Sequence, residues 1–349
     1  MEKFDPNGVG IANGNIFGFP VSEAEADIIL LPIPWDATAS YGKGTSRGPE
    51  QILAASTQLD FYHPKCEKAF QTKVCMMPVS QDGLALNDQF EAKTSRYIQF
   101  LEEGGQLSDH SEYLKLLEEV AAVQAEIKAQ LKNKSQEYIN KGKIPAVIGG
   151  EHSVPLGLLE ALNDQGEPFG VLQLDAHADL RDAYEGFEQS HASIYFNGLK
   201  LPQLKKLVQV GIRDVAQSEV DLINSSDGRV VTFFDWDIKE AIYRGKSWAE
   251  WVAEIIAELP QRVYISYDID VLEPFLCPHT GTPVSGGFKL EEMTYLIHEV
   301  VSSGREIIGF DLCEVANGST DWDANVGARA LWQLVIATER SRRQKLGLD

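Results

Sequence analysis

The sequence predicts an α/β fold, a single-domain three-layer α/β/α sandwich around a mostly parallel sheet. Short apolar runs rich in Val and Ile recur along the chain, and helical stretches separate them. Each run is apolar on both faces rather than alternating, which is typical of parallel strands that helices cover on both sides. Strands that alternate with helices favour an open layered sheet. No linker or internal repeat breaks this order, so one domain over residues 1–349 is expected.

Seven segments are expected to form the strands, in the order in which the apolar runs occur. A long gap separates the first run from the second, and a helical insertion is expected there, around residues 80–143. The expected strands are residues 26–32, 145–148, 169–174, 207–212, 229–234, 262–267 and 306–312.

Residues 111–140 within this insertion have the pattern of an amphipathic helix. Apolar side chains step by three and four residues, while Glu and Lys occupy the opposite face. The helix is expected to dock on the sheet, and contact with a partner subunit is the alternative. The polar loop 102–110 contains a Gly-Gly pair and is expected to be exposed. The stripe consists of Leu117, Val120, Val123, Gln124, Ile127 and Leu131.

The composition argues against several classes of protein. The chain carries 31 Lys and Arg against 52 Asp and Glu, a formal net charge of −21, whereas nucleic-acid binding needs clustered basic residues. An acidic surface attracts cations, although simple solubility explains the charge equally well. No apolar run is long enough for a membrane span and residues 1–20 lack a secretory signal, so a cytoplasmic protein with no membrane partner is expected. The four cysteines lack a CxxC spacing and are expected to be thiols.

Two acids and a histidine follow the strand expected at residues 169–174. Asp175, His177 and Asp179 are two residues apart, so their side chains point to the same side of an extended chain. Without a metal, two carboxylates at the end of a buried strand repel each other and lose solvation. A divalent cation resolves this conflict, which favours a metal site over the alternative of an exposed acidic turn.

Two further segments also follow predicted strands. His152 stands in the turn 149–153 (GGEHS), and alone it indicates a packed or capping histidine more often than a ligand. Asp268 and Asp270 follow residues 262–267, and a D-x-D pair alone is common. All three segments lie at the carboxyl ends of strands, where open α/β sheets bind their ligands.

Together the three segments supply six candidate ligands, four carboxylates and two imidazoles. This set suits Mn²⁺ better than Zn²⁺, and two ions better than one. Two ions ~3.5–4 Å apart can activate a shared water near neutral pH. The candidates are His152, Asp175, His177, Asp179, Asp268 and Asp270.

These segments resemble the signatures of the ureohydrolase (arginase/agmatinase) family. GGEHS is similar to the family's GGDHS, and DAHADL (175–180) to its DAHxD. Residues 266–287 (SYDIDVLEPFLCPHTGTPVSGG) are similar to its SxDxDxxDPxxxPGTGTPxxGG, and the likeness extends back to residues 42–49 (GKGTSRGP). The resemblance covers nearly the whole chain. It implies a single domain with about eight mostly parallel strands, assembled as a homo-oligomer, often a trimer or hexamer.

The resemblance also implies a role for each candidate ligand. Asp175 and Asp268 would bridge two manganese ions, and nickel is the alternative metal. One ion would be bound by His152, Asp175, Asp179 and Asp268, and the other by His177, Asp175, Asp268 and Asp270.

Three further residues match active-site positions of the family. His191, in residues 189–193 (QSHAS), matches a histidine that carries protons. Glu314 matches the acid that binds the guanidinium group, because a carboxylate can accept two parallel N–H bonds. Thr282 matches a threonine in the same pocket. Without the resemblance, His191 would be taken for a surface-loop histidine and Glu314 for an acid at a helix N-terminus.

Two departures from the family pattern affect the expected site. Glu151 stands where the family has Asp, and it is expected to support the ligands without being one. His279 stands where the family has a small residue. It either narrows the pocket wall or points to solvent.

The resemblance implies hydrolysis of a small cationic guanidino compound to urea and an amine. Loop 180–191 lacks the segment with which arginases hold an amino-acid head and is nearer to agmatinase-like members. Agmatine, which yields putrescine, is therefore expected. The acids Asp182, Glu185 and Glu188 either attract its cationic tail or are merely solvated. Guanidinobutyrate, guanidine, arginine and formiminoglutamate are the alternative substrates.

Two other functions are compatible with such a fold. A metal-dependent deacetylase usually carries two adjacent histidines, and this sequence has no such pair. A non-catalytic binding protein with the arginase fold is the second alternative. Release of urea distinguishes the expected enzyme from both.

Overall fold

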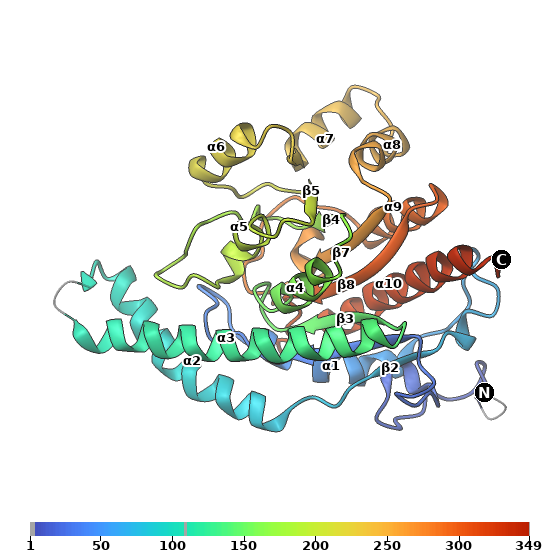
Figure 1. Cartoon of the computed structure of the whole chain (residues 1–349), viewed down its shortest axis with the longest axis horizontal. Coiled ribbons are helices and arrows are strands. Elements are labelled where there is room, and N and C mark those ends of the chain that lie inside the picture. Colours follow the sequence, from blue (N-terminus) through green and yellow to red (C-terminus); the bar gives the residue numbers. More distant parts are fainter. Residues whose placement is uncertain (1–3, 108–109, 349) are drawn as a thin grey trace.

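The computed structural model describes residues 4–107 and 110–348, and these contain one eight-stranded sheet (Figure 1). All strand pairs are parallel, in the order β2-β1-β3-β8-β7-β4-β5-β6. The predicted fold class is confirmed. The strands are β1 (Ile28–Ile33), β2 (Val74–Met76), β3 (Ile144–Gly149), β4 (Phe169–Leu174), β5 (Leu204–Val210), β6 (Val230–Phe233), β7 (Arg262–Asp268) and β8 (Glu306–Cys313).

Seven of these strands lie where the apolar runs predict them, with ends that differ by at most three residues. The sequence pattern does not predict β2. This strand pairs with β1 at the edge of the sheet. It has only three residues, which is too few to show a recognisable pattern of apolar residues.

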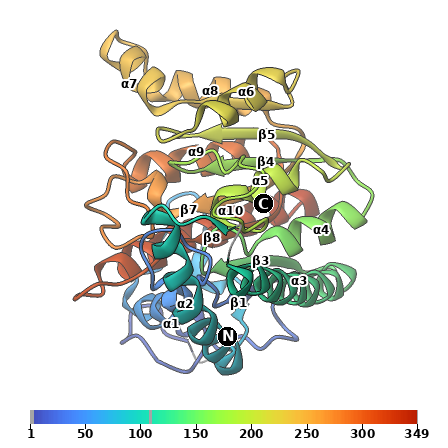
Figure 2. The same cartoon turned by 90° about the vertical axis from the view of Figure 1, so that its left-hand side faces the viewer.

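Helices cover both faces of the sheet (Figure 2). On one face α3 and α4 pack against each other and against β3, whereas α1, α9 and α10 pack together on the other. The apolar runs are buried between these layers, which explains why they are apolar on both sides. The helices are α1 (Gly48–Ala55), α2 (Gln81–Glu102), α3 (Ser111–Asn140), α4 (Leu156–Asp164), α5 (Ile194–Gly198), α6 (Gln217–Ser225), α7 (Asp235–Tyr243), α8 (Trp248–Glu258), α9 (Leu290–Ser302) and α10 (Trp322–Leu346).

Local sequence explains where several helices begin and end. The Ser80 hydroxyl accepts a hydrogen bond from Gly83 N at the start of α2. Ser247 and Glu250 form a reciprocal capping box at the start of α8, which satisfies backbone N–H groups that the helix leaves unpaired. Gly347 ends α10 in the left-handed conformation that glycine adopts at no steric cost.

The predicted helix at residues 111–140 is α3, and its stripe faces the protein. Val120, Gln124 and Leu131 are buried, and the remaining stripe positions are half-buried. Figure 1 shows α3 lying beside α2 along the lower side of the molecule. The expected docking is therefore confirmed. In the polar loop Gly104 is exposed, while residues 108–109 lie outside the described part of the chain.

The helices and the cysteines agree with two further expectations from the sequence. Among the described residues, every helix is too short or too polar to cross a bilayer. The four cysteines are buried and form no disulfide in the part of the chain that the structure describes, as expected.

A pair of histidines lies against α10. The rings of His63 and His298 are 4.6 Å apart, and Gln333 Oε1 lies 3.1 and 2.9 Å from their Nε2 atoms. Arg340 Nη1 donates to Nδ1 of His298 at 2.9 Å, so this ring must be neutral. Burial, aided by the charge of Arg340, lowers the pKa of His298 to about 4.

The stability of the protein should therefore fall as the pH drops from about 6.5 to about 4. The unfolded chain takes up a proton at His298 near its ordinary pKa of about 6.5, whereas the folded chain does so only near pH 4. Protonation therefore favours unfolding across this window, and the stabilisation is fully present only above it. At about 1.4 kcal/mol per pH unit, the loss reaches roughly 3 kcal/mol.

Thermal unfolding midpoints of wild type and His298→Gln, measured from pH 7.5 to 4, test this prediction. The glutamine variant cannot take up the proton, so its midpoint should fall less steeply than that of wild type. Equal slopes would contradict the assignment of a neutral His298.

Candidate metal centre

The predicted site segments follow four strands that are neighbours in the sheet, β3, β8, β7 and β4. Because all strands are parallel, their carboxyl ends lie at one edge of the sheet. The order of the strands along the chain changes at this place, since β8 and β7 lie between β3 and β4. The segments carry His152 after β3, Asp175, His177 and Asp179 after β4, Asp268 and Asp270 at the end of β7, and Glu314 after β8.

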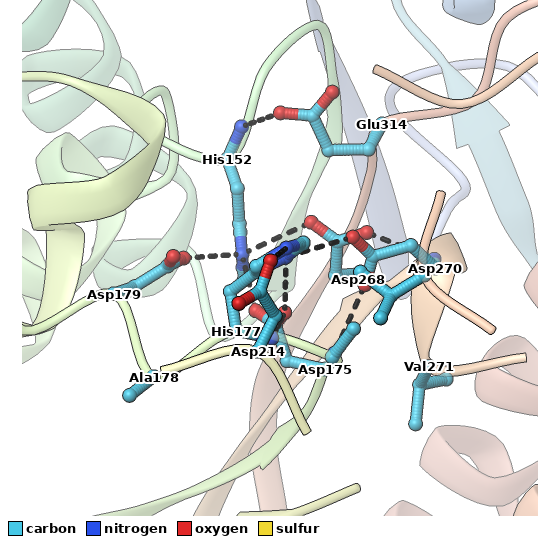
Figure 3. Close-up of polar contacts among 12 residues, drawn as sticks. His152, Asp175, His177, Ala178, Asp179, Asp214, Asp268, Asp270, Val271 and Glu314 are labelled. Atoms are coloured by element: carbon cyan, nitrogen blue, oxygen red, sulfur yellow. Dashed lines mark hydrogen bonds and ion pairs between the residues drawn. The ribbon is translucent and has the colours of Figure 1, made fainter. Parts of the chain in front are cut away.

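His152 lies at the centre of the first group of side chains (Figure 3). Its Nδ1 atom is 3.0 Å from Asp175 Oδ2 and 3.0 Å from Asp179 Oδ2. Asp268 Oδ2 lies 3.3 Å from the same nitrogen. All four side chains are buried, so three carboxylates converge on one imidazole away from solvent.

His177 forms the second group with Asp270 and Asp175. Its Nδ1 atom lies 3.0 Å from Asp270 Oδ2 and 3.7 Å from Asp175 Oδ1. The ligand atoms of His152, Asp175 and Asp179 lie within 4.8 Å of one another, as do those of Asp175, His177 and Asp270, so Asp175 belongs to both sets. The structure thus brings all six predicted ligands to one place, with Asp175 between the two groups.

The chemistry of this set fits divalent metal ions. Burial and the neighbouring carboxylates raise the pKa of Asp179 to about 8 and hold that of Asp268 well above its usual range. Nδ1 of His152 and Oδ2 of Asp270 lie close to their ion-pair partners, but neither makes a hydrogen bond of regular geometry among the described residues. Buried acids and buried polar atoms without a regular hydrogen bond are costly in the absence of a cation, and oxygen-rich donor sets suit Mn²⁺ or Mg²⁺.

A second ring of contacts orients His152. Its Nε2 atom lies 2.8 Å from Ser266 Oγ, which donates to Asp311 Oδ2 at 2.8 Å. This contact turns Nδ1 toward the carboxylates, as outer contacts of metal-binding histidines commonly do. Neither Ser266 nor Asp311 was predicted from the sequence as a site residue. Each is a buried polar residue inside an apolar strand, which is a usable signal.

Asp175 is held by a row of polar side chains that crosses three strands. Gln173 Nε2 donates to Asp175 Oδ2 at 2.9 Å, and Gln209 Nε2 donates to Gln173 Oε1 at 2.7 Å. The Thr232 hydroxyl donates to Gln209 Oε1 at 2.7 Å. These residues were not predicted either, although glutamines within the apolar runs of β4 and β5 mark them.

Glu314 lies beside the two groups with one carboxylate oxygen unused. Its Oε1 atom accepts a hydrogen bond of 2.8 Å from His152 N. Its Oε2 atom is buried and has no partner in the described part of the chain. The backbone of Glu314 has a φ of 64°, a strained conformation for a residue with a side chain, which marks functional sites. A Cβ atom on Gly281 would lie 2.9 Å from Oε2, so glycine leaves this oxygen room.

His191 and Thr282 border the same small cavity of about 120 Å³ together with His177 and Asp179. His191 begins a short 3₁₀ helix (His191–Ser193), and its Nε2 atom lies 3.1 Å from Ser40 Oγ. Burial lowers the pKa of His191, so its ring is a neutral imidazole. Ser40 is a further lining residue that the sequence did not predict.

The two departures from the family pattern have distinct environments. The Glu151 carboxylate is buried and accepts hydrogen bonds from the hydroxyls of Thr38 and Ser153. It belongs to neither group of metal-ligand atoms. His279 neither lines the cavity nor simply faces solvent, because its Nδ1 lies 2.9 Å from Asp323 Oδ2 at the start of α10.

Loop 180–191 presents fewer acids to the cavity than its sequence contains. Asp182, Glu185 and Glu188 do not line it; Asp182 and Glu188 are exposed and Glu185 is half-buried. Arg181 does line it, with its Nε 3.8 Å from Glu219 Oε2. The acid at its rim is Asp214, whose side chain is 71% exposed and 4.0 Å from His177.

The Arginase family matches this chain over residues 26–337. The N(1)-aminopropylagmatine ureohydrolase of Synechocystis sp. is 28% identical over 331 residues, 93% of each chain. That of Thermococcus kodakarensis is 30% identical over 85% of this chain and 86% of its own. The agmatinase of Bacillus subtilis is 27% identical over 89% of this chain and 92% of its own.

Solved structures agree in fold. The agmatine ureohydrolase of Thermoplasma volcanium is 22% identical with a TM-score of 0.69, covering 93% of this chain and 94% of its own. The arginase of Bacillus subtilis is 19% identical with a TM-score of 0.63, covering 89% and 98%.

Proposed function

Because the chain belongs to the arginase family, we propose that it hydrolyses a guanidino compound to urea and an amine at a binuclear metal centre. Agmatine is the proposed substrate and putrescine the proposed product. The observation that carries the proposal is the unpartnered Oε2 atom of Glu314, buried beside the six converging donors. A planar guanidinium offers N–H groups that match a carboxylate held in this way.

The donor set would hold two divalent ions, with Mn²⁺ proposed and Ni²⁺ as the alternative. Such ions, when bound, supply Lewis acidity and make a water molecule acidic near neutral pH. The first would be bound by His152, Asp175, Asp179 and Asp268, and the second by His177, Asp175, Asp268 and Asp270.

Glu314, together with His191 and Thr282 of the cavity wall, would orient the substrate and move a proton. Oε1 of Glu314 is fixed by His152 N, so Oε2 would accept an N–H from the guanidinium and place its carbon against the donor groups. His191 is neutral and its Nδ1 has no partner among the described residues. That nitrogen would first take up the proton that the attacking water loses and then pass it to the leaving amine. Thr282 would border the substrate on the same cavity.

Agmatine is favoured over the other guanidino compounds by two observations. The relatives with 27–30% identity are named for agmatine or its aminopropyl derivative. The rim acid Asp214 and the net charge of −21 suit a substrate with a cationic tail.

Urea release from the metal-reconstituted protein tests the proposal. With Mn²⁺, agmatine should give urea faster than guanidinobutyrate, guanidine, arginine or formiminoglutamate. Faster urea release from one of the other compounds would show that agmatine is not the preferred substrate, while the proposed type of reaction would stand. No urea from any of them, with metal bound, would contradict the proposed activity and favour a binding protein. Acetate released from an acetylated polyamine would indicate a deacetylase.

We also propose a single domain over residues 1–349 with an insertion around 80–143, a trimeric or hexameric assembly, and a cytoplasmic location. Scattering at several protein concentrations measures the assembly.

A further inference from the structure

The helices α2 and α3 lie over two loops that border the candidate site. One is loop 36–44, between β1 and α1, which carries Ser40. The other is loop 180–191, which carries His191 at its end. Both residues line the cavity, and the Ser40 hydroxyl lies 3.1 Å from His191 Nε2. The two loops therefore meet at the proposed proton-transfer residue.

Helix α2 holds the first two residues of loop 36–44, Asp36 and Ala37. Asp36 N donates to Asn87 Oδ1 at 2.8 Å, and the Asn87 amide donates back to Asp36 Oδ1 at 2.8 Å. The Thr94 hydroxyl donates to Ala37 O at 2.5 Å. All these polar side chains are buried, and buried hydrogen bonds are costly to lose because water cannot replace them.

Helix α3 joins the two loops through a single side chain. Gln124 Nε2 donates to Thr38 Oγ1 at 3.0 Å and also to the Gln189 carbonyl. Thr38 in turn donates to the buried Glu151 carboxylate. Gln189 precedes His191 by two residues, and Thr38 precedes Ser40 by two. The amide of Gln124 thus contacts the Thr38 side chain and the Gln189 backbone, just before the two residues that contact each other in the cavity.

A second contact holds loop 180–191 further along. The Tyr97 hydroxyl donates to Glu185 O at 2.8 Å, and its ring packs edge-on against Phe187 at 5.7 Å. Tyr97 is fully buried and Phe187 nearly so. The loop is therefore attached to both helices at separate points.

We propose that Gln124 and Thr38 are positioning residues that set the place of His191, and that the helical insertion serves as the scaffold of this catalytic loop. The proposal rests on the proposed function. A polar residue in the buried stripe of a helix is costly unless its hydrogen bonds are made, and both acceptors of Gln124 lie on the loops. Loops are otherwise the mobile parts of a fold, whereas proton transfer needs tightly fixed groups.

The first test compares Gln124→Met with Gln130→Met. Methionine keeps the length of glutamine and suits a helix but cannot donate, and Gln130 is an exposed residue of the same helix. Gln124→Met should lower kcat by about 10²-fold, the scale expected for misplacement by about 1 Å. Its KM and its bound Mn²⁺ should stay near the wild-type values. Gln130→Met should match wild type in all three.

The second test uses the partner of Gln124. Thr38→Val removes the hydroxyl and should lower kcat, whereas Thr38→Ser keeps it and should restore most of the activity. The double variant Gln124→Met/Thr38→Val should lose little more than the worse single variant, because both changes break one connected network. If the free-energy costs that the two single variants impose on kcat added in full, Gln124 and Thr38 would not act through one network.

A third measurement does not depend on turnover. Amide hydrogen exchange across residues 181–193 should be faster in Gln124→Met than in wild type or Gln130→Met, with α4 unchanged. Unchanged exchange in this segment overturns the positioning role, even if the wild type releases no urea. If this segment exchanges faster in Gln124→Met but the wild type releases no urea, the scaffold role of the insertion stands and only the proposed reaction is wrong.

Discussion

Asp175→Asn should abolish urea release by removing the carboxylate that both groups of donors share. Asparagine fills the same space but offers only one neutral oxygen as a ligand. Since metal ions contribute several kcal/mol to the stabilisation of a transition state, activity should fall by at least about 10³-fold. Metal analysis after gel filtration should show fewer than two ions per chain. The metal-dependent rise in melting temperature should shrink as well, because binding stabilises only the folded state.

The matched control is Asp227→Asn, the same change on the surface between α6 and β6. Asp227 is exposed and has a positive φ, which asparagine tolerates, so metal content and activity should stay at wild-type levels. An Asp175→Asn protein with two bound ions and normal turnover would remove the basis of the proposed centre.

Glu314→Gln should remove substrate binding while leaving the metal content intact. The amide oxygen can still accept the hydrogen bond from His152 N, so the turn should keep its shape. The negative charge next to the guanidinium is lost. Breaking a buried charged pair costs about 2–5 kcal/mol, so kcat/KM should fall by about 10²-fold to 10³-fold.

Metal content separates this outcome from the loss caused by Asp175→Asn. The control is Glu167→Gln, since Glu167 is exposed and pairs with Arg262 at the opposite end of β7. A Glu314→Gln enzyme with unchanged kcat/KM would show that this acid does not bind the substrate.

Strands and candidate ligands were predictable from the sequence for one physical reason. Strands buried on both faces must be apolar throughout, so their ends are visible wherever polar residues resume. Asp175, His177 and Asp179 follow directly on such an end, as do Asp268 and Asp270. Parallel strands then bring these ends to one edge, which explains why local motifs predicted a joint site.

The residues that the sequence did not reveal depend on which strands are neighbours. Asp311 of β8 reaches His152 through Ser266 of β7, although these three residues are far apart in the chain. Ser40 is an ordinary loop serine until His191 is placed beside it. His279 could not be assigned because its partner Asp323 lies on α10, after the last strand.

The place of β8 between β3 and β7 has a consequence for biosynthesis. Without this strand the sheet consists of two separate halves, β2-β1-β3 and β7-β4-β5-β6, each with an apolar inner border that lacks a partner. A ribosome must therefore release residues 306–313 before the two halves can join. Nascent chains that end earlier would expose the unpaired edges of β3 and β7, which can pair with other molecules. Protection of such chains from aggregation should therefore depend on chaperones.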